Sequence, residues 1–218
     1  MSRARIQLFE ERAAEYDAWF ASGRGRLLYR SELAALRLLR PAMAGPVLDV
    51  GCGTGVFSVD LDAALGVDPS REELRLARRR GLPVAQGVAE QLPLAPGRFG
   101  GVLFITSFCY IDDPARALAE ARRVLAADGR VLVAEINRDS AWGRDYLRRQ
   151  REGDPFYGLA SLYTMAETLL LLRDAGFEPE AYASTLQQPP ESVTRVEEPA
   201  PALVPAAGFV CVLARQRS

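Results

Sequence analysis

The sequence predicts an α/β fold in which a doubly wound, mostly parallel sheet of seven strands ends in an antiparallel hairpin. Short apolar runs alternate with segments of helical periodicity, which is the order of repeated strand–helix–strand units. The runs are apolar throughout rather than alternating, as expected of parallel strands that helices cover on both faces. The 218 residues, 49% of them hydrophobic, suffice for one sizeable core, so we expect a single domain.

The expected strands are apolar runs bounded by turn residues. Five belong to the parallel part of the sheet, at residues 47–50, 63–67, 83–85, 102–105 and 131–134. Two later runs, 177–186 and 209–213, would pair as the antiparallel hairpin at the edge of the sheet. The segment between them, 188–205, is rich in Pro, Glu and Ala and reads as a surface connection.

The expected helices have recognisable ends. Two capping-box pairs mark helix starts, Ser70 with Glu73 and Thr164 with Glu167. Another helix begins at Pro114, after Asp112 and Asp113 as caps, and is expected to stop at Gly129. Strands and helices therefore alternate through the parallel half of the chain.

Composition excludes several kinds of chemistry. All 27 basic residues are arginine and the chain has no histidine, which removes Ser-His-Asp catalysis, zinc catalysis and Schiff-base lysine. The cysteines, Cys52, Cys109 and Cys211, lack metal-ligand spacing, so no metal site is predicted.

Charge and hydropathy limit the expected partners. Twenty-eight acidic residues leave a net charge of -1, and no overall positive field would hold nucleic acid or an anionic membrane. The first twenty residues are charged throughout, and no later run approaches the roughly 18 apolar residues of a membrane span. We expect a cytoplasmic protein with a small-molecule substrate and neither nucleic-acid nor membrane partners; its oligomeric state stays open.

The stretch VLDVGCGTGVF, at residues 47–57, predicts a ligand site at a strand end. Gly51, Gly53 and Gly55 allow a sharp turn and close approach to a flat ligand. A dinucleotide site would have glycine at position 56, where this chain has Val56, and a Walker loop would need lysine. Asp49 before the turn would repel phosphate but attract an ammonium or sulfonium group. The expected ligand is therefore cationic near this loop.

This stretch resembles motif I of the class I S-adenosylmethionine-dependent methyltransferases, and the chain is similar to the small bacterial type 11 group. The resemblance continues through LGVDPS at 65–70, AEQLPL at 89–94, ARRVLAADGRVLVAE at 121–135 and LLLLRDAGFEP at 169–179. It implies a Rossmann-like fold, with S-adenosylmethionine as cofactor and S-adenosylhomocysteine as product.

The resemblance also implies the cofactor contacts. Asp68, at the end of the second strand, would accept hydrogen bonds from both ribose hydroxyls. Ala89 and Glu90 would lie beside the adenine, although Val88 replaces the aspartate that the family often places there. The expected cofactor-binding residues are Asp49, Gly51, Cys52, Gly53, Gly55, Asp68, Pro69, Ala89, Glu90, Thr106 and Tyr16.

The acceptor is expected beside the strand at 102–105. The cofactor-binding half, 46–137, would lie between an N-terminal helical cover, 1–45, and a small helical lid, 138–163, with the last helix and strands in 164–218. The expected substrate contacts are Cys109, Tyr110, Trp19, Trp142 and Tyr146. If the acceptor must lose a proton, the candidate catalytic bases are Tyr110, Asp112 and Glu135.

These features predict an enzyme that methylates a small molecule by in-line displacement, with nitrogen, oxygen, sulfur and carbon acceptors all open. One alternative is a non-catalytic module that binds S-adenosylmethionine. A less favoured one is an NAD-dependent oxidoreductase, against which Val56 and Asp49 both argue.

Overall fold

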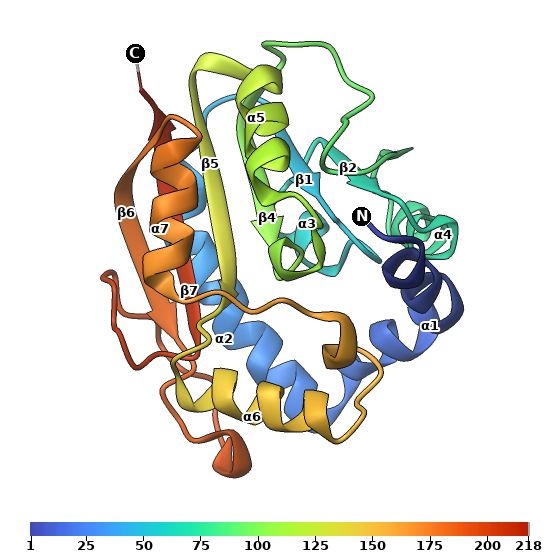
Figure 1. The fold of residues 1–218 in the computed structure, drawn as a ribbon, viewed down its shortest axis with the longest axis vertical. Coiled ribbons are helices and arrows are strands. Elements are labelled where there is room, and N and C mark those ends of the chain that lie inside the picture. Colours follow the sequence, from blue (N-terminus) through green and yellow to red (C-terminus); the bar gives the residue numbers. More distant parts are fainter. Residues whose placement is uncertain (218) are drawn as a thin grey trace.

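The computed structural model describes residues 1–217 and contains one seven-stranded sheet, in the order β3-β2-β1-β4-β5-β7-β6 (Figure 1). The strands are β1 (Val47–Val50), β2 (Leu65–Asp68), β3 (Val84–Gln86), β4 (Phe99–Ile105), β5 (Leu125–Ile136), β6 (Phe177–Thr185) and β7 (Phe209–Gln216). The first five strands are parallel, and β7 runs antiparallel between β5 and β6. The predicted doubly wound sheet with an antiparallel closing hairpin is confirmed.

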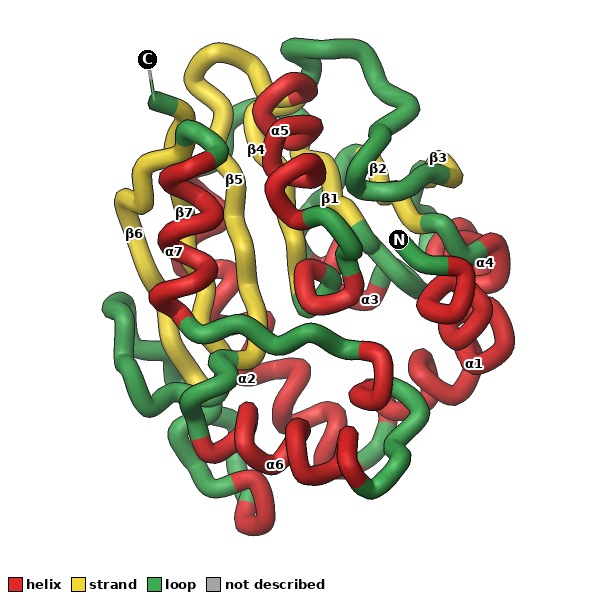
Figure 2. Tube along the Cα trace, in the orientation of Figure 1, coloured by secondary structure: helices red, strands yellow, loops and turns green. Residues whose placement is uncertain are grey.

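Helices cover both faces of the sheet and one of its ends. They are α1 (Arg3–Ala21), α2 (Gly23–Leu39), α3 (Val56–Asp60), α4 (Arg71–Arg79), α5 (Pro114–Val124), α6 (Ala141–Arg151) and α7 (Met165–Asp174), with short 3₁₀ turns η1 (Arg40–Ala42), η2 (Phe108–Tyr110), η3 (Tyr157–Leu159) and η4 (Pro190–Ser192). Helices α5 and α7 lie on one face and α2 behind the other, while α6 lies beyond the end of β5 (Figures 1 and 2). None of the helices in residues 1–217 combines the length and apolarity needed to cross a membrane.

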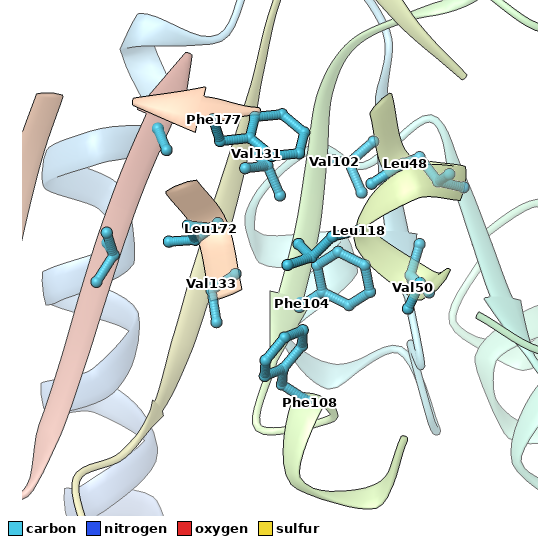
Figure 3. Packing of buried hydrophobic residues seen from close by; sticks show 14 of the residues in the cluster. Leu48, Val50, Val102, Phe104, Phe108, Leu118, Val131, Val133, Leu172 and Phe177 are labelled. Carbon is cyan, nitrogen blue, oxygen red and sulfur yellow. The ribbon is translucent and has the colours of Figure 1, made fainter. Parts of the chain in front are cut away.

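Two hydrophobic clusters fill the spaces between the sheet and these helices. The cluster under α5 and α7 contains Leu48 and Val102, and Figure 3 shows their packing with the neighbouring residues. The cluster under α2 and α6 contains Val47 and Leu103. Successive residues of β1 and β4 thus point into opposite clusters, which explains why β4 is apolar throughout and β1 is apolar except for Asp49.

The boundary between α5 and β5 differs from the prediction. The helix stops at Val124, not at Gly129, because Leu125 already pairs with Phe99 of β4. Strand β5 is consequently twelve residues long. The helical pattern after Val124 was misleading because pairing with a distant strand overrides local propensity.

Candidate active site

The first of two adjoining cavities lies beside the carboxyl ends of β1, β2 and β4, where the strand order reverses. It encloses about 850 Å³, part of it open to solvent. Its lining includes ten of the eleven predicted cofactor-binding residues: Asp49, Gly51, Cys52, Gly53, Asp68, Pro69, Ala89, Glu90, Thr106 and Tyr16. Gly55 is outside the lining; its left-handed backbone (φ 78°) starts α3, and an added Cβ would lie 3.2 Å from Ala77 Cβ.

The glycine turn is held tightly against its neighbours. Gly51 has a φ of 73°, and its amide donates to the Val67 carbonyl at 2.7 Å, which ties the turn to β2. A Cβ at Gly51 would lie 2.5 Å from Ser107 Cβ. Gly53 has a φ of 53°, and its amide donates to Asp68 Oδ2 at 3.0 Å. The bare backbone therefore serves both the turn and its close contact with the end of β4.

Asp49 is a buried carboxyl with one open side. It is 2% exposed, and its Oδ2 accepts a hydrogen bond from the Ser58 hydroxyl at 2.6 Å. Its Oδ1 is buried without a hydrogen-bond partner among residues 1–217. Burial raises the pKa of Asp49 to about 7. An unpaired oxygen in the lining fits a positively charged ligand group.

Two further acids face the same cavity. Asp68 accepts from the Gly53 and Ser70 amides, and burial raises its pKa to about 6. Glu73 Oε1 is buried without a partner within the described chain, and burial together with Asp68 raises the pKa of Glu73 well above its ordinary value. With Glu90, which forms an ion pair with the Met1 ammonium at 2.8 Å, the lining holds four acids and, among residues 1–217, no arginine. This charge favours a cationic ligand and disfavours phosphates.

The role predicted for Glu73 at the start of α4 is only half right. The Ser70 hydroxyl accepts from the Glu73 amide at 3.2 Å, as an N-cap does. A capping box also requires a hydrogen bond from the Ser70 amide to the Glu73 side chain. That amide instead donates to Asp68 Oδ1 at 2.8 Å. The Glu73 side chain instead lines the cavity, beside Gly53. The box at Thr164 and Glu167, by contrast, is complete.

Helix α1 covers the first cavity and is attached to α4 by polar contacts. Glu10 Oε2 accepts hydrogen bonds from the Ser70 hydroxyl and the Arg71 amide, both at 2.8 Å. Asp17 forms an ion pair with Arg80 at 2.7 Å. A carboxylate at the N-terminus of α4 is favoured by the unpaired amides there. These contacts place Tyr16 of α1 in the wall of the cavity.

The second cavity adjoins the first and is lined mainly by aromatic side chains. It encloses about 1130 Å³, part of it open to solvent. Five residues line both cavities: Tyr16, Phe20, Phe57, Thr106 and Tyr110. Thr106, at the end of β4, has a φ of 50°, an uncommon backbone conformation for a β-branched residue. Such strain is frequent where a structure fixes functional groups.

Four of the five predicted substrate residues line the second cavity, namely Cys109, Tyr110, Trp19 and Tyr146. Trp142 is instead a core residue, 1% exposed, whose indole N–H donates to the Gln188 carbonyl at 2.9 Å. Its ring packs so closely on Gly208 that a Cβ there would lie 2.3 Å from Trp142 Cδ1. The structure therefore does not bring Trp142 to the cavity.

The three candidate bases are placed differently. The Tyr110 hydroxyl donates to the Phe156 carbonyl at 3.2 Å, and burial raises the pKa of Tyr110 well above its ordinary value, which disfavours deprotonation. Asp112 forms an ion pair with Arg5 at 2.8 Å and lies outside both linings. Glu135 accepts from the Thr168 hydroxyl of α7 and also lies outside both linings. Of the three candidates, only Tyr110 lines the cavities.

Sequence reasoning missed a buried, unpaired acid in the second cavity, Glu32 of α2. This side chain is 5% exposed and has no hydrogen-bond or ion-pair partner among residues 1–217. Its position was a usable signal, because it lies four residues from Leu28 and from Leu36, both fully buried. An acid on the buried stripe of a helix calls for a partner or a ligand.

The fold and the first cavity together define a class of protein. A glycine turn after β1, an acid at the end of β2 and an acid-lined cavity at the switch point are the arrangement of a class I methyltransferase. The observed open Asp49 oxygen and the left-handed Gly51 and Gly53 fit a cofactor that carries a sulfonium and a ribose.

Comparison with known proteins establishes the family. The methyltransferase domain family of type 11 matches residues 48–133. A crystal structure from Thermotoga maritima, of a SAM-dependent methyltransferase and possible histamine N-methyltransferase, is 35% identical, covers 97% of this chain and 99% of its own, and superposes with a TM-score of 0.89. The chain belongs to the S-adenosylmethionine-dependent methyltransferase family, and S-adenosylmethionine is its cofactor.

Other relatives match along most of the chain. An uncharacterized protein of Mycobacterium tuberculosis is 41% identical over 203 residues, which are 93% of this chain and 71% of the relative. An uncharacterized protein of Methanocaldococcus jannaschii is 31% identical over 192 residues, 88% of this chain and 91% of the relative. The similarity thus extends well beyond the residues 48–133 that the family matches.

Proposed function

We propose that this methyltransferase transfers the methyl group to a small molecule bound in the second cavity. The observation that carries the proposal is the shared wall: Thr106 and Tyr110 line both cavities, so a cofactor in one and an acceptor in the other would be neighbours. The aromatic lining suits an acceptor of modest size with apolar surface. The balanced net charge supports a small molecule over nucleic acid or a membrane surface.

The residues of the first cavity would bind and orient the cofactor, whose sulfonium supplies an activated methyl group. Asp68 would accept the ribose hydroxyls, and the open Asp49 oxygen would face the positively charged half. Tyr16 and Phe20 of α1 would exclude water from the junction between the cavities. Holding two reactants in line in a dry site lowers the barrier by several kcal/mol without a dedicated base.

The shape of the second cavity is compatible with a nitrogen, oxygen, sulfur or carbon atom as the methyl acceptor. The Thermotoga maritima protein is named a possible histamine N-methyltransferase, which supports including nitrogen acceptors here. A non-catalytic cofactor-binding module would need no second cavity of this size beside the first. We therefore favour catalysis over binding alone.

The first experiment is calorimetric titration with S-adenosylmethionine and S-adenosylhomocysteine, with NADH as the control ligand. The wild-type protein and Asp68→Ala are compared with Asp128→Ala. Asp128 is an exposed aspartate near the start of β5, whereas the cavity lies at the carboxyl ends of the strands. Binding of both cofactor forms, weakened about tenfold or more by Asp68→Ala alone, supports the assignment. Equal binding by all three proteins, or saturable binding of NADH, would contradict it.

A screen then tests methyl transfer itself. The protein is incubated with S-adenosylmethionine labelled in its methyl group and with panels of small amines, alcohols, thiols and aromatic rings. Transfer to a member of any panel supports the proposed function. Tight cofactor binding without transfer to any panel would instead favour the non-catalytic module.

A further inference from the structure

We infer that the acceptor is a small primary or secondary amine with an apolar or aromatic body, and that Glu32 binds its nitrogen. This inference rests on the proposed function and narrows it to one class of substrate. It is carried by one side chain, a buried and unpartnered carboxyl in the wall of an aromatic cavity.

The position of Glu32 explains why it needs a ligand. A glutamate residue that is only 5% exposed and lacks a partner within residues 1–217 is unfavourable for folding. No arginine of the described chain pairs with it, and burial alone raises its pKa to about 8. Glu32 contributes to the raised pKa of Tyr16, Tyr146, Tyr157 and Cys211, and none of these neighbours is cationic.

The other charged groups of the second cavity are already paired. Arg149 forms an ion pair with Asp154 at 2.6 Å and lies 4.5 Å from the centre of the Tyr157 ring. Glu15 forms an ion pair with Arg12 at 2.7 Å. Glu32 is therefore the unpaired acid of this cavity within the described residues, and a bound cation would favour its ionised form.

The surrounding rings match an organic ammonium group. Tyr146 and Tyr157 stack with ring centroids 4.0 Å apart, and Phe20 and Tyr16 meet edge to face at 5.1 Å. Both pairs line the second cavity. Aromatic faces attract cations and accept the apolar remainder of an amine, whereas a carboxylate ligand would be repelled by Glu32.

The same pairing provides the proton transfer that an amine requires. An ammonium group has no free electron pair, so it passes one proton to the Glu32 carboxylate, which leaves a neutral amine and a neutral carboxyl. A carboxyl that holds its proton near neutral pH makes this transfer close to balanced. The nitrogen electron pair then forms the N–C bond as the methyl carbon–sulfur bond breaks, with that bonding pair remaining on sulfur. The product leaves as an N-methylammonium ion, and Glu32 later returns its proton to solvent.

The test compares matched amines and alcohols by calorimetry on protein saturated with S-adenosylhomocysteine. The probes are 2-phenylethylamine with 2-phenylethanol, and hexylamine with hexanol. Glu32→Gln keeps the shape of the side chain but removes its charge, and Glu191→Gln is the control, because Glu191 is exposed on η4. Circular dichroism and S-adenosylhomocysteine affinity report whether each variant is folded with an intact cofactor site.

We expect each amine to bind about ten- to a hundredfold more tightly than its alcohol, as a hydrogen bond to a charged group implies. Glu32→Gln should abolish this preference while keeping cofactor affinity, and Glu191→Gln should change neither. Equal affinities for amines and alcohols, an amine preference that survives Glu32→Gln, or no amine binding at all would overturn the inference. Each of these outcomes leaves the proposed function standing, since loss of cofactor binding, not of amine binding, is what would remove it.

Discussion

Replacing Gly51 with alanine tests how the site depends on a bare backbone at the end of β1. The substitution has two effects that the structure separates. The φ of 73° is left-handed, which costs an alanine about 1 kcal/mol. The new Cβ would also lie 2.5 Å from Ser107 Cβ, so the chain must shift, as in overpacked cores that lose about 1–3 kcal/mol.

Gly45 offers a matched control for the first effect. Its φ is 70°, but an added Cβ would have no atom within 4 Å. Gly45→Ala should therefore lower the free energy of unfolding by about 1 kcal/mol, and Gly51→Ala by about 2–4 kcal/mol. For a domain of this size the larger loss corresponds to a fall in Tm of roughly 5–15 °C. Urea unfolding of both variants measures the difference directly.

A double variant identifies the contact responsible. Ser107→Gly removes the Cβ that the new methyl group would meet, together with the hydroxyl that donates to the Val50 carbonyl at 2.7 Å. Combined with Gly51→Ala, it should be less destabilising than the sum of the two single changes by about 1–3 kcal/mol. The steric argument would be refuted if Gly45→Ala and Gly51→Ala lowered the free energy of unfolding equally. It would also be refuted if the effects of Gly51→Ala and Ser107→Gly on that free energy were strictly additive.

Three further predictions follow from the buried groups. Asp49→Asn should weaken S-adenosylmethionine binding more than S-adenosylhomocysteine binding. Because burial raises the pKa of Asp49 to about 7, the affinity of the wild-type protein for S-adenosylmethionine should fall as the pH drops from 8 to 6. Equal weakening of both cofactor forms in calorimetry would contradict this. Burial raises the pKa of Glu135 from 4.5 to about 8, so between these pH values the folded state keeps a proton that the unfolded state loses. The free energy of unfolding should therefore fall as the pH rises through this range, and it should fall less in Glu135→Gln. Urea unfolding from pH 5 to 9 measures both proteins, and the same pH dependence of unfolding free energy in both would contradict the prediction. Trp142→Phe should lower the free energy of unfolding by about 1–3 kcal/mol while leaving the acceptor KM unchanged, whereas a raised KM at unchanged stability would restore Trp142 as a substrate residue.

The parts of the fold that could be predicted are those whose signal is local. The strand 47–50 and the glycine turn are contiguous in sequence, and their identities alone indicate a buried strand that ends at a ligand site. Leu125 could not be assigned in this way, because its strand state comes from pairing with Phe99, twenty-six residues earlier in the chain. Local propensity gives little information about such pairing.

In the candidate site, too, the residues that could be predicted are those with a local sequence signal. Nine of the ten predicted cofactor-side residues that line the first cavity are at or just after a strand end, where the fold class places ligands, and Tyr16 of α1 is the exception. Trp142 was misassigned because its partner Gly208 is far along the chain. Glu73 and Glu32 were missed because acids within helices usually face solvent. The packing of α1 over α4 encloses Glu73, and Glu32 shares the wall of the second cavity with Tyr146 of α6.

Helix α1 has a consequence for how the two ligands communicate. It has nineteen residues but buries only Phe9 and Ala13, and Tyr16 and Phe20 on it line both cavities. Because few of its groups are buried, detaching α1 from the rest of the fold should require less free energy than detaching a core helix. A ligand in either cavity would gain contacts with the docked helix, so each ligand would favour the docked state to which the other also binds. If the acceptor binds in the second cavity as proposed, cofactor and acceptor would be thermodynamically linked, and each should raise the affinity of the protein for the other by the same factor.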